Sequence, residues 1–276
     1  MKNAVVRTLS GIVYAGLIFG CLLAPTGWPF AVLILFMMCT MLAEFYRMTM
    51  GDSYKVSRLL AIAEGVVLFL LLYACCAYDM PGKYVSLSII PLVALMVCSL
   101  FPKDKSAFLK FGFICTGLLY IVAPMSLSTL LVFRGGSFNG VLLLCFFIII
   151  WCSDIGAYCL GSMLGQKYGR KIAPDISPKK SWVGFWGGYA LALVAALVLH
   201  WTGVLDIPVL HCIVLATLMH LSGVAGDLFE SMWKRCCDCK DSGSIIPGHG
   251  GMLDRFDSTL LALPVGIAYL VLFNLI

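Results

Sequence analysis

The chain has 276 residues, of which 61% are hydrophobic and only 12% are charged, and its mean hydropathy is +0.99. Soluble domains are not this apolar, so the composition excludes a water-soluble protein. The formal net charge is +5 at pH 7. In such an apolar chain, basic charge suits anionic lipid headgroups. We therefore expect membrane lipids as partners, and no nucleic acid.

Apolar stretches recur along the whole chain. A membrane-spanning helix needs about 20 mostly apolar residues. Nine windows come close to this length, and they predict an all-α integral membrane protein with about nine transmembrane helices. We expect the first window to be a retained helix, because no small-residue cleavage site follows it. The windows are 9–24, 28–47, 58–77, 85–101, 110–132, 140–161, 182–201, 208–230 and 258–276.

The loops between these windows predict the orientation. If the N-terminus is cytoplasmic, only Lys83 and Arg134 of the 19 lysines and arginines lie on the opposite side. The positive-inside rule favours this arrangement. It places the two long polar loops, 162–181 and 231–257, at the cytoplasmic face.

The two halves of the chain differ in polar content. Residues 1–138, with about five helices, hold few charges, although Glu44 and Glu64 lie near cytoplasmic helix ends. Residues 139–276, with about four helices and both long loops, hold nearly all the polar residues of interest. We expect the first part to be a scaffold or interface and the second to be a catalytic region.

The densest polar segment is residues 231–257, which we call the polar island. Asp254 and Asp257 share a face at the start of the last helix, where acidic residues also favour a helix N-terminus. The backbone of the glycine-rich turn 247–251 is suited to an anion-binding concavity. His249 is a candidate phosphate donor or proton shuttle, or else a solvated loop histidine.

Cysteines number 13, and most stand singly in apolar windows, which is typical of a reducing compartment. Cys236, Cys237 and Cys239 cluster in the polar island. A zinc site would need Asp238 or His249 as a fourth ligand. The spacing matches no paired-cysteine zinc pattern, so we expect free thiols.

Two apolar windows contain acids. Asp154 lies inside the sixth window, and an acid in a span is a candidate functional residue, with pairing to a lysine for packing as the alternative. Asp227 lies near the cytoplasmic end of the eighth window. Glu230 and Ser231 share its helix face.

The loop before the seventh helix carries Ser177, Lys179 and Lys180. The lysines form a compact cationic pair, either an anchor at the cytoplasmic face or a clamp for a phosphate-rich ligand. Carboxylates and cations gathered at one membrane face suit Mg²⁺ held partly by substrate phosphates. The residues therefore predict transfer of a phosphate-containing group at the lipid–water boundary.

The polar island resembles the signature of the phosphatidate cytidylyltransferases, also called CDP-diglyceride synthases. That pattern is a serine, Lys-Arg, Lys-Asp, Pro-x-His-Gly-Gly and Asp-Arg-x-Asp. The corresponding positions are Ser231, Lys234-Arg235, Lys240-Asp241, 247–251 and Asp254-Arg255-Phe256-Asp257. Upstream matches at Asp154, residues 177–184 and Gly226-Asp227 extend the resemblance over residues 150–257.

One position departs from the pattern. The family usually has Thr-Trp-Glu-Gly after the lysine pair, whereas this chain has Ser181-Trp182-Val183-Gly184. Serine keeps the hydroxyl, but Val183 removes a carboxylate. Either the glutamate is dispensable, or Glu230 or another acid replaces it.

The resemblance implies a bacterial inner-membrane enzyme with a cytoplasmic site that transfers CMP from CTP to phosphatidic acid, giving CDP-diacylglycerol and pyrophosphate. It implies Mg²⁺ as one or two ions, with or without a monovalent cation, and it is compatible with a homodimer. Asp227, Asp254 and Asp257 would be the metal ligands. The other implied catalytic residues are Lys234, Arg235 and His249, and the implied substrate-binding residues are Asp154, Ser177, Lys179, Lys180, Ser231, Lys240, Asp241, Gly250, Gly251 and Arg255.

Three other functions compete with this one. A CTP-dependent lipid kinase, or a cytidylyltransferase for another lipid phosphate, would use similar groups. A CDP-alcohol phosphotransferase would need an Asp-Gly-x-x-Ala-Arg run, which the sequence lacks. A transporter would favour midplane sites in two halves, whereas the charges here crowd one face of one half.

Overall fold

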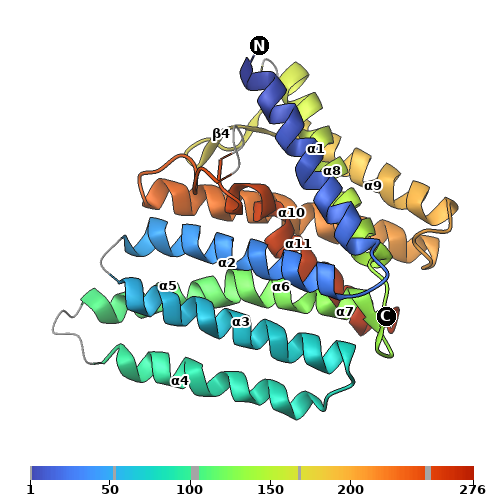
Figure 1. The fold of residues 1–276 in the computed structure, drawn as a ribbon. Coiled ribbons are helices and arrows are strands. Elements are labelled where there is room, and N and C mark those ends of the chain that lie inside the picture. The colour runs from blue at the N-terminus through green and yellow to red at the C-terminus, as the bar shows by residue number, and fades with distance from the viewer. Residues whose placement is uncertain (1, 52–53, 101–105, 167–168, 246–249) are drawn as a thin grey trace. The chain divides into compact units, whose positions relative to one another are not determined.

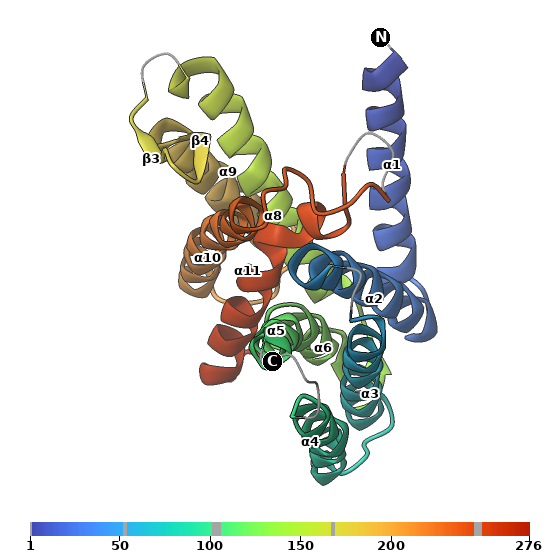
Figure 2. The ribbon, with the colours of Figure 1, turned by 90° about the vertical axis from the view of Figure 1, so that its left-hand side faces the viewer.

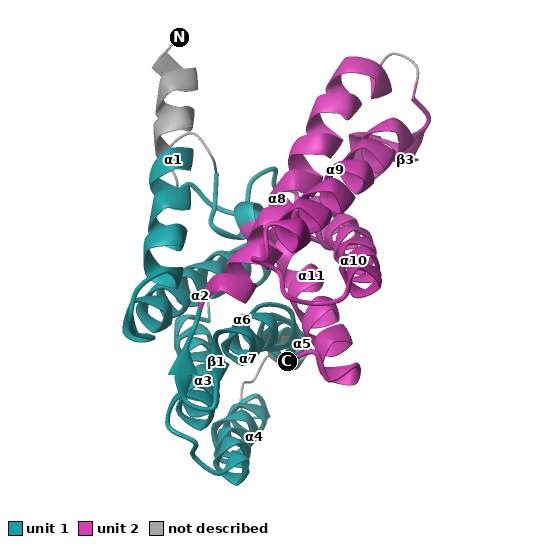
Figure 3. Cartoon of the chain, turned by 90° about the vertical axis from the view of Figure 1, so that its right-hand side faces the viewer, with its two compact units in different colours: residues 1–139, 239–255 teal, residues 140–238, 256–276 magenta. Residues whose placement is uncertain are grey.

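Helices account for nearly all the regular structure in the computed structural model, which describes residues 2–51, 54–100, 106–166, 169–245 and 250–276 (Figure 1). In a largely apolar chain, a helix satisfies every backbone polar group within its own segment. The chain divides into two compact units, residues 1–139 with 239–255 and residues 140–238 with 256–276 (Figure 3). The polar island is thus shared between them. The assignment of residues 1–138 as a scaffold or interface and of residues 139–276 as a catalytic region stays a prediction.

Unit 1 consists of helices and one short hairpin. Figure 1 shows α2, α3 and α4 side by side, and α2 also packs on α5. The elements are α1 (Lys2–Leu22), α2 (Trp28–Met50), α3 (Lys55–Ala77), η1 (Gly82–Ser88), α4 (Ile89–Cys98), α5 (Ser106–Gly117), η2 (Leu118–Val122), α6 (Ala123–Leu127), α7 (Thr129–Val132), β1 (Phe133–Arg134) and β2 (Ser137–Phe138).

Two local features of unit 1 follow from its sequence. The π-helical turn η2 ends two residues before Pro124, which has no amide hydrogen to offer the preceding turn. The antiparallel hairpin β1–β2 turns at Gly135 and Gly136, whose φ angles of +52° and +75° suit a tight two-residue turn. The hairpin pairs Phe133 with Phe138 in the aromatic core of this unit.

Unit 2 holds three long helices, a second hairpin and most of the last helix (Figure 2). Its hairpin β3–β4 is antiparallel and leads directly into α9. The elements are α8 (Val141–Leu160), η3 (Gly161–Gly165), β3 (Lys171–Ala173), β4 (Ser177–Ser181), α9 (Trp182–Trp201), α10 (Val209–Cys236) and α11 (Leu253–Leu272), whose first residues belong to unit 1.

Glycines bring α8 and α9 into close contact. A Cβ atom added at Gly156 would lie 2.5 Å from the Gly187 carbonyl oxygen, and one at Gly188 would lie 2.7 Å from the Ser153 carbonyl oxygen. Small residues let membrane helices approach to this distance. Gly161 extends the contact to Gly184. This packing sets the position of Asp154 on α8.

By length and composition, seven helices within the described residues can cross a membrane. Together with many exposed apolar side chains, such as those of Val32 and Leu119, they indicate an integral membrane protein. Of two shorter apolar helices, Gly11–Leu22 lies within the first predicted window and Gly82–Cys98 overlaps the fourth. The seven are Trp28–Met50, Lys55–Ala77, Lys110–Val132, Val141–Gly165, Trp182–Trp201, Val209–Cys236 and Leu253–Leu272.

The α8–α9 contact predicts that Gly156→Ala will destabilise the protein. The added methyl group would press on helix backbone, which cannot move aside as a flexible side chain can. We expect a loss of about 1–3 kcal/mol, the usual cost of overpacking. Thermal unfolding in detergent would measure it. Gly112→Ala on α5 is the control, because a Cβ there meets nothing within 4 Å, and an equal loss in both variants would contradict the contact.

Candidate active site

Four carboxylates of unit 2 come together from three helices. Asp257 of α11 interacts electrostatically with Asp227 and Glu230 of α10 and with Asp154 of α8. The approach of α11 to α10 depends on Gly226, because a Cβ atom there would collide with the Asp257 carbonyl oxygen. We call these four residues the acidic cluster.

Asp227 is held from two sides. The Lys180 ammonium lies 2.6 Å from its Oδ2 atom. The Ser231 hydroxyl, one turn later on α10, donates to its Oδ1 atom over 3.4 Å. The Asp227 side chain keeps about a third of its surface exposed (34%), so part of the carboxylate can still be reached.

Glu230 is the most deeply buried member of the cluster. Its side chain has 0% exposure, and its Oε2 atom lies 2.5 Å from the Lys234 ammonium one turn later. A charge buried this fully requires a partner. The sequence predicted that Asp227, Glu230 and Ser231 share a face of α10, and the structure confirms it, with Lys234 on the same face.

Asp154 and Asp257 are linked through Ser258 of α11. The Ser258 hydroxyl donates to Asp154 Oδ1 over 3.3 Å, and its amide donates to Asp257 Oδ1 over 2.7 Å. Asp154 is exposed and Asp257 is partly buried. Asp154 is therefore not buried, and its role stays a prediction.

Lys179 and Lys180 are neighbours on strand β4, so their side chains point in opposite directions. Successive side chains of a strand point to opposite faces. Lys180 reaches Asp227, whereas the Lys179 side chain is exposed and its backbone carbonyl accepts a 2.7 Å hydrogen bond from the side-chain Nε2 atom of Gln166. The expected compact cationic pair is therefore one lysine on the acidic cluster and one at the surface.

The strand is joined to its helix by a cap. Ser181 is the N-cap residue of α9, and its hydroxyl accepts a 3.2 Å hydrogen bond from the Gly184 amide. Val183, which replaces the family's glutamate, lies in the first turn of α9 beside Gly165.

The acidic cluster carries four carboxylates, of which Asp227 is paired with Lys180 and Glu230 with Lys234. Hard oxygen donors in this setting have the chemistry that Mg²⁺ prefers, with substrate phosphates and water completing the shell. No three acidic, histidine or cysteine side chains among the described residues form a ready-made metal site. Asp227 and Asp257 thus fit Mg²⁺ as a partial ligand set that needs further donors.

The part of the polar island in unit 1 folds around two other carboxylates. Asp254 Oδ2 accepts the Ser242 and Gly251 amides at 3.0 and 2.8 Å. Glu44 of α2 accepts the Met252 and Leu253 amides. The Gly251 amide, predicted to face an anionic ligand, donates to Asp254 here.

Other predicted residues lie at the surface. Arg235 is exposed, and its Nε atom donates to the Ile176 carbonyl oxygen in the β3–β4 turn over 3.3 Å. Gly250 adopts a φ of +83°, which favours glycine. Ser177 begins β4, and His249 lies outside the described residues. The remaining exposed residues of the prediction are Lys240, Asp241 and Arg255.

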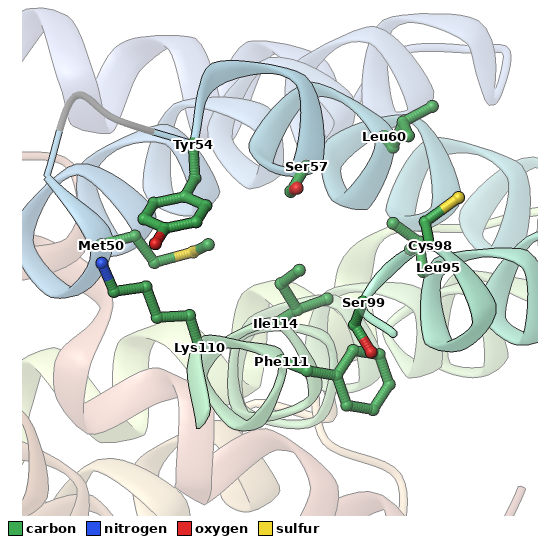
Figure 4. Close-up of a pocket in the computed structure, with 10 residues that line it drawn as sticks. All are labelled: Met50, Tyr54, Ser57, Leu60, Leu95, Cys98, Ser99, Lys110, Phe111 and Ile114. Atoms are coloured by element: carbon green, nitrogen blue, oxygen red, sulfur yellow. The ribbon is translucent and has the colours of Figure 1, made fainter. Parts of the chain in front are cut away.

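Unit 1 also contains a pocket. It opens between α2, α3, α4 and α5, where the Lys110 ammonium lies 3.9 Å from the centre of the Tyr54 ring (Figure 4). Apolar side chains such as Leu95, Phe111 and Ile114 complete its wall. None of its lining residues belongs to the predicted site.

Two polar groups were missed by the sequence reasoning. Glu44 was noted only for its place near a helix end. His220, buried in α10, shares a 2.8 Å hydrogen bond with Ser153, the neighbour of Asp154. Both are ionisable residues inside apolar windows, the signal that singled out Asp154. His220 also lies two turns before Asp227 on the same face of α10.

Comparison with known proteins bears on this site. The phosphatidate cytidylyltransferase of Bacillus subtilis (strain 168) is 33% identical over 279 residues, covering 97% of this chain and 98% of that protein. The Haemophilus influenzae phosphatidate cytidylyltransferase is 34% identical over 72% of this chain and 75% of its own length. The Staphylococcus aureus (strain COL) phosphatidate cytidylyltransferase is 30% identical over 94% of this chain and 96% of its own length.

The family model described as "Cytidylyltransferase family" matches residues 5–273 and so includes every residue of the acidic cluster. The resemblance drawn from the polar island therefore extends over nearly the whole chain, and this protein belongs to the cytidylyltransferase family.

Proposed function

We propose that this chain transfers CMP from CTP to phosphatidic acid, releasing pyrophosphate and forming CDP-diacylglycerol. Similarity to phosphatidate cytidylyltransferases over nearly the full length supports the activity. The observation that carries it is the acidic cluster, in which carboxylates and lysines meet beside apolar helices that can cross a membrane. Such a site suits a phosphate-rich nucleotide and a lipid phosphate together.

The reaction needs little acid–base chemistry. An oxygen of the lipid phosphate attacks the α-phosphorus of CTP, the bond from that phosphorus to the bridging oxygen breaks, and pyrophosphate leaves with the electron pair. The phosphate of phosphatidic acid is already mostly ionised near neutral pH. Catalysis therefore depends on positioning and on neutralising charge.

The lysines supply part of that neutralisation. Lys180 and Lys234 each hold a carboxylate in the substrate-free protein. Their ammonium groups are point charges that can turn to a phosphate oxygen when the acids acquire another cation. Exposed Lys179 and Arg235 lie on the same elements and would meet the outer phosphates.

Asp227 and Asp257, with Asp254 as a further ligand predicted from the sequence, would hold Mg²⁺, as one or two ions and with or without a monovalent cation. When bound, the metal would neutralise charge on the phosphate oxygens. Asp154 and Ser231 would orient ligands beside these acids. The other proposed contacts, which follow from the sequence pattern, are Ser177, Lys240, Asp241, His249, Gly250, Gly251 and Arg255.

The loop charges support a cytoplasmic site in a bacterial inner membrane with the N-terminus on the same side. Nine spans are part of this proposal, with Gly11–Leu22 and Gly82–Cys98 as the two shorter members. A homodimer is compatible with it.

The position of a radiolabel tests the reaction. Purified protein would be given Mg²⁺, phosphatidic acid and CTP labelled at either the α- or the γ-phosphorus. We expect α-label in the lipid and γ-label in pyrophosphate. Lipid carrying the γ-label would instead identify a kinase. Repeating the assay with other lipid phosphates in place of phosphatidic acid tests the remaining alternative, a cytidylyltransferase that acts on a different lipid phosphate.

Asp227→Asn and Asp257→Asn should each abolish CMP transfer. Each change removes a charge but keeps the side-chain shape, and we expect turnover to fall by at least about a hundredfold, as for loss of one preorganised charge contact. Initial rates of lipid-linked CMP formation would measure it. Asp206→Asn, exposed in the loop between α9 and α10, is the control. Near-wild-type turnover in either variant would rule out the assigned ligand role.

Val183→Glu should change activity by no more than a few-fold. The acidic cluster already holds Glu230 with its own lysine, so a further carboxylate in the first turn of α9 is not required. Val183→Gln controls for size without charge. A large gain in CMP transfer with glutamate alone would show that the missing family carboxylate matters.

A further inference from the structure

A carboxylate from α2 holds the segment that leads into α11. Glu44 is only 6% exposed. Its Oε1 atom accepts the Met252 amide at 3.0 Å, and its Oε2 atom accepts the Leu253 amide at 2.9 Å and the Ser242 hydroxyl at 3.2 Å. About 200 residues of sequence separate the donors from the acceptor.

Two of these donors are backbone amides at the start of α11, where the amides have no hydrogen-bond partner within the helix. Leu253 is the first residue of α11, and Met252 directly precedes it. These amides carry the positive end of the helix dipole, so a negative charge there is stabilising. Glu44 therefore acts as a cap supplied by another helix, and it sets the residue at which α11 begins.

Two glycines of the polar island fit around this carboxylate. A Cβ atom added at Gly251 would lie 2.6 Å from Glu44 Oε2, and one at Gly243 would overlap the same carboxylate. Side chains at these positions would push the segment away from Glu44. Gly243 and Gly251 thus leave room for the Glu44 carboxylate, whether or not they also contact a ligand.

The same segment fixes Asp254. The Ser242 amide donates to Asp254 Oδ2 while the Ser242 hydroxyl donates to Glu44. The Gly251 amide donates to Asp254, and the next two amides donate to Glu44. The two carboxylates thus share donors from Ser242 and from residues 251–253, so displacing these donors from Glu44 would also disturb the Asp254 side chain.

We infer that Glu44 is a positioning residue for the reaction, which acts by holding Ser242 and residues 251–253 so that Asp254 is presented in one geometry. This role rests on the proposed function. Glu44 itself contacts backbone and a hydroxyl, and is not a catalytic residue. Glu64 of α3 is the matched comparison, since it is equally buried (4% exposed) but has no hydrogen-bond partner for its Oε2 atom among the described residues.

Hydrogen exchange on the purified full-length protein tests the anchor without reference to activity. Glu44→Gln keeps the shape but sets an NH₂ group against one of the amides. We expect faster exchange in peptides covering residues 251–253 in this variant, and wild-type exchange in Glu64→Gln. If Glu44→Gln does not fold, Glu44→Asp keeps the charge with one methylene less reach. Unchanged exchange in the folded variant would overturn the anchor.

Kinetics test the positioning role. We expect Glu44→Gln to lower CMP transfer about 10- to 100-fold, as for loss of a residue that orients a metal ligand, and to raise the half-saturating Mg²⁺ concentration. If the variant were only unstable, a smaller fraction of the protein would be active, but the half-saturating Mg²⁺ concentration would not change. Faster exchange with wild-type turnover and Mg²⁺ dependence would overturn the role, as would equal effects in Glu64→Gln. If the wild-type protein forms no lipid-linked CMP, the proposed function fails, and exchange still decides whether Glu44 holds the segment.

Discussion

This structure depends on supplying hydrogen-bond donors or cations to carboxylates that lie inside an apolar protein. Only 14 acidic residues occur in the chain, and a carboxylate removed from water needs donors or cations close by. Glu230 meets this need with Lys234, and Glu44 meets it with two amides and a hydroxyl. The first solution lies within α10, whereas the second ties α2 to the segment that leads into α11.

Glycine is the second half of the same solution. Where α8 meets α9, and where α10 meets α11, the absence of a side chain lets backbone approach backbone at Gly156 and Gly226. The second of these approaches brings Asp257 of α11 beside Asp227 of α10. Small residues in the helices therefore help to set the positions of polar residues at the site.

The sequence predicted the helices well where local signals are strong. The seventh window coincides with α9 because Ser181 caps it and a lysine-rich strand precedes it. The last apolar window begins at residue 258, and the helix begins at Leu253, so Asp254 and Asp257 lie at its start as predicted. The capping of this start by Glu44 is a contact that no local pattern reveals. The hairpins were missed because strands of two to five residues leave almost no periodic signal.

In the candidate site, too, features set by local sequence could be predicted, and features set by contacts between distant segments could not. Asp227, Glu230 and Ser231 could be placed on one face from helical spacing alone. The pairing of Lys180 with Asp227 depends on how β4 meets α10, and the sequence allowed the lysine pair to be either an anchor or a clamp. Contacts between distant segments are decided by packing, so chemistry could be assigned to residue types more securely than to partners.

The division of the chain has a consequence for biosynthesis. Unit 1 includes residues 239–255, which are made only after α8, α9 and α10. During membrane insertion, Glu44 therefore enters with α2 long before its amide donors exist, and the first unit stays incomplete until nearly the whole chain has left the ribosome. A fragment that ends near residue 139 would lack residues 239–255 and would therefore retain Glu44 without its amide donors.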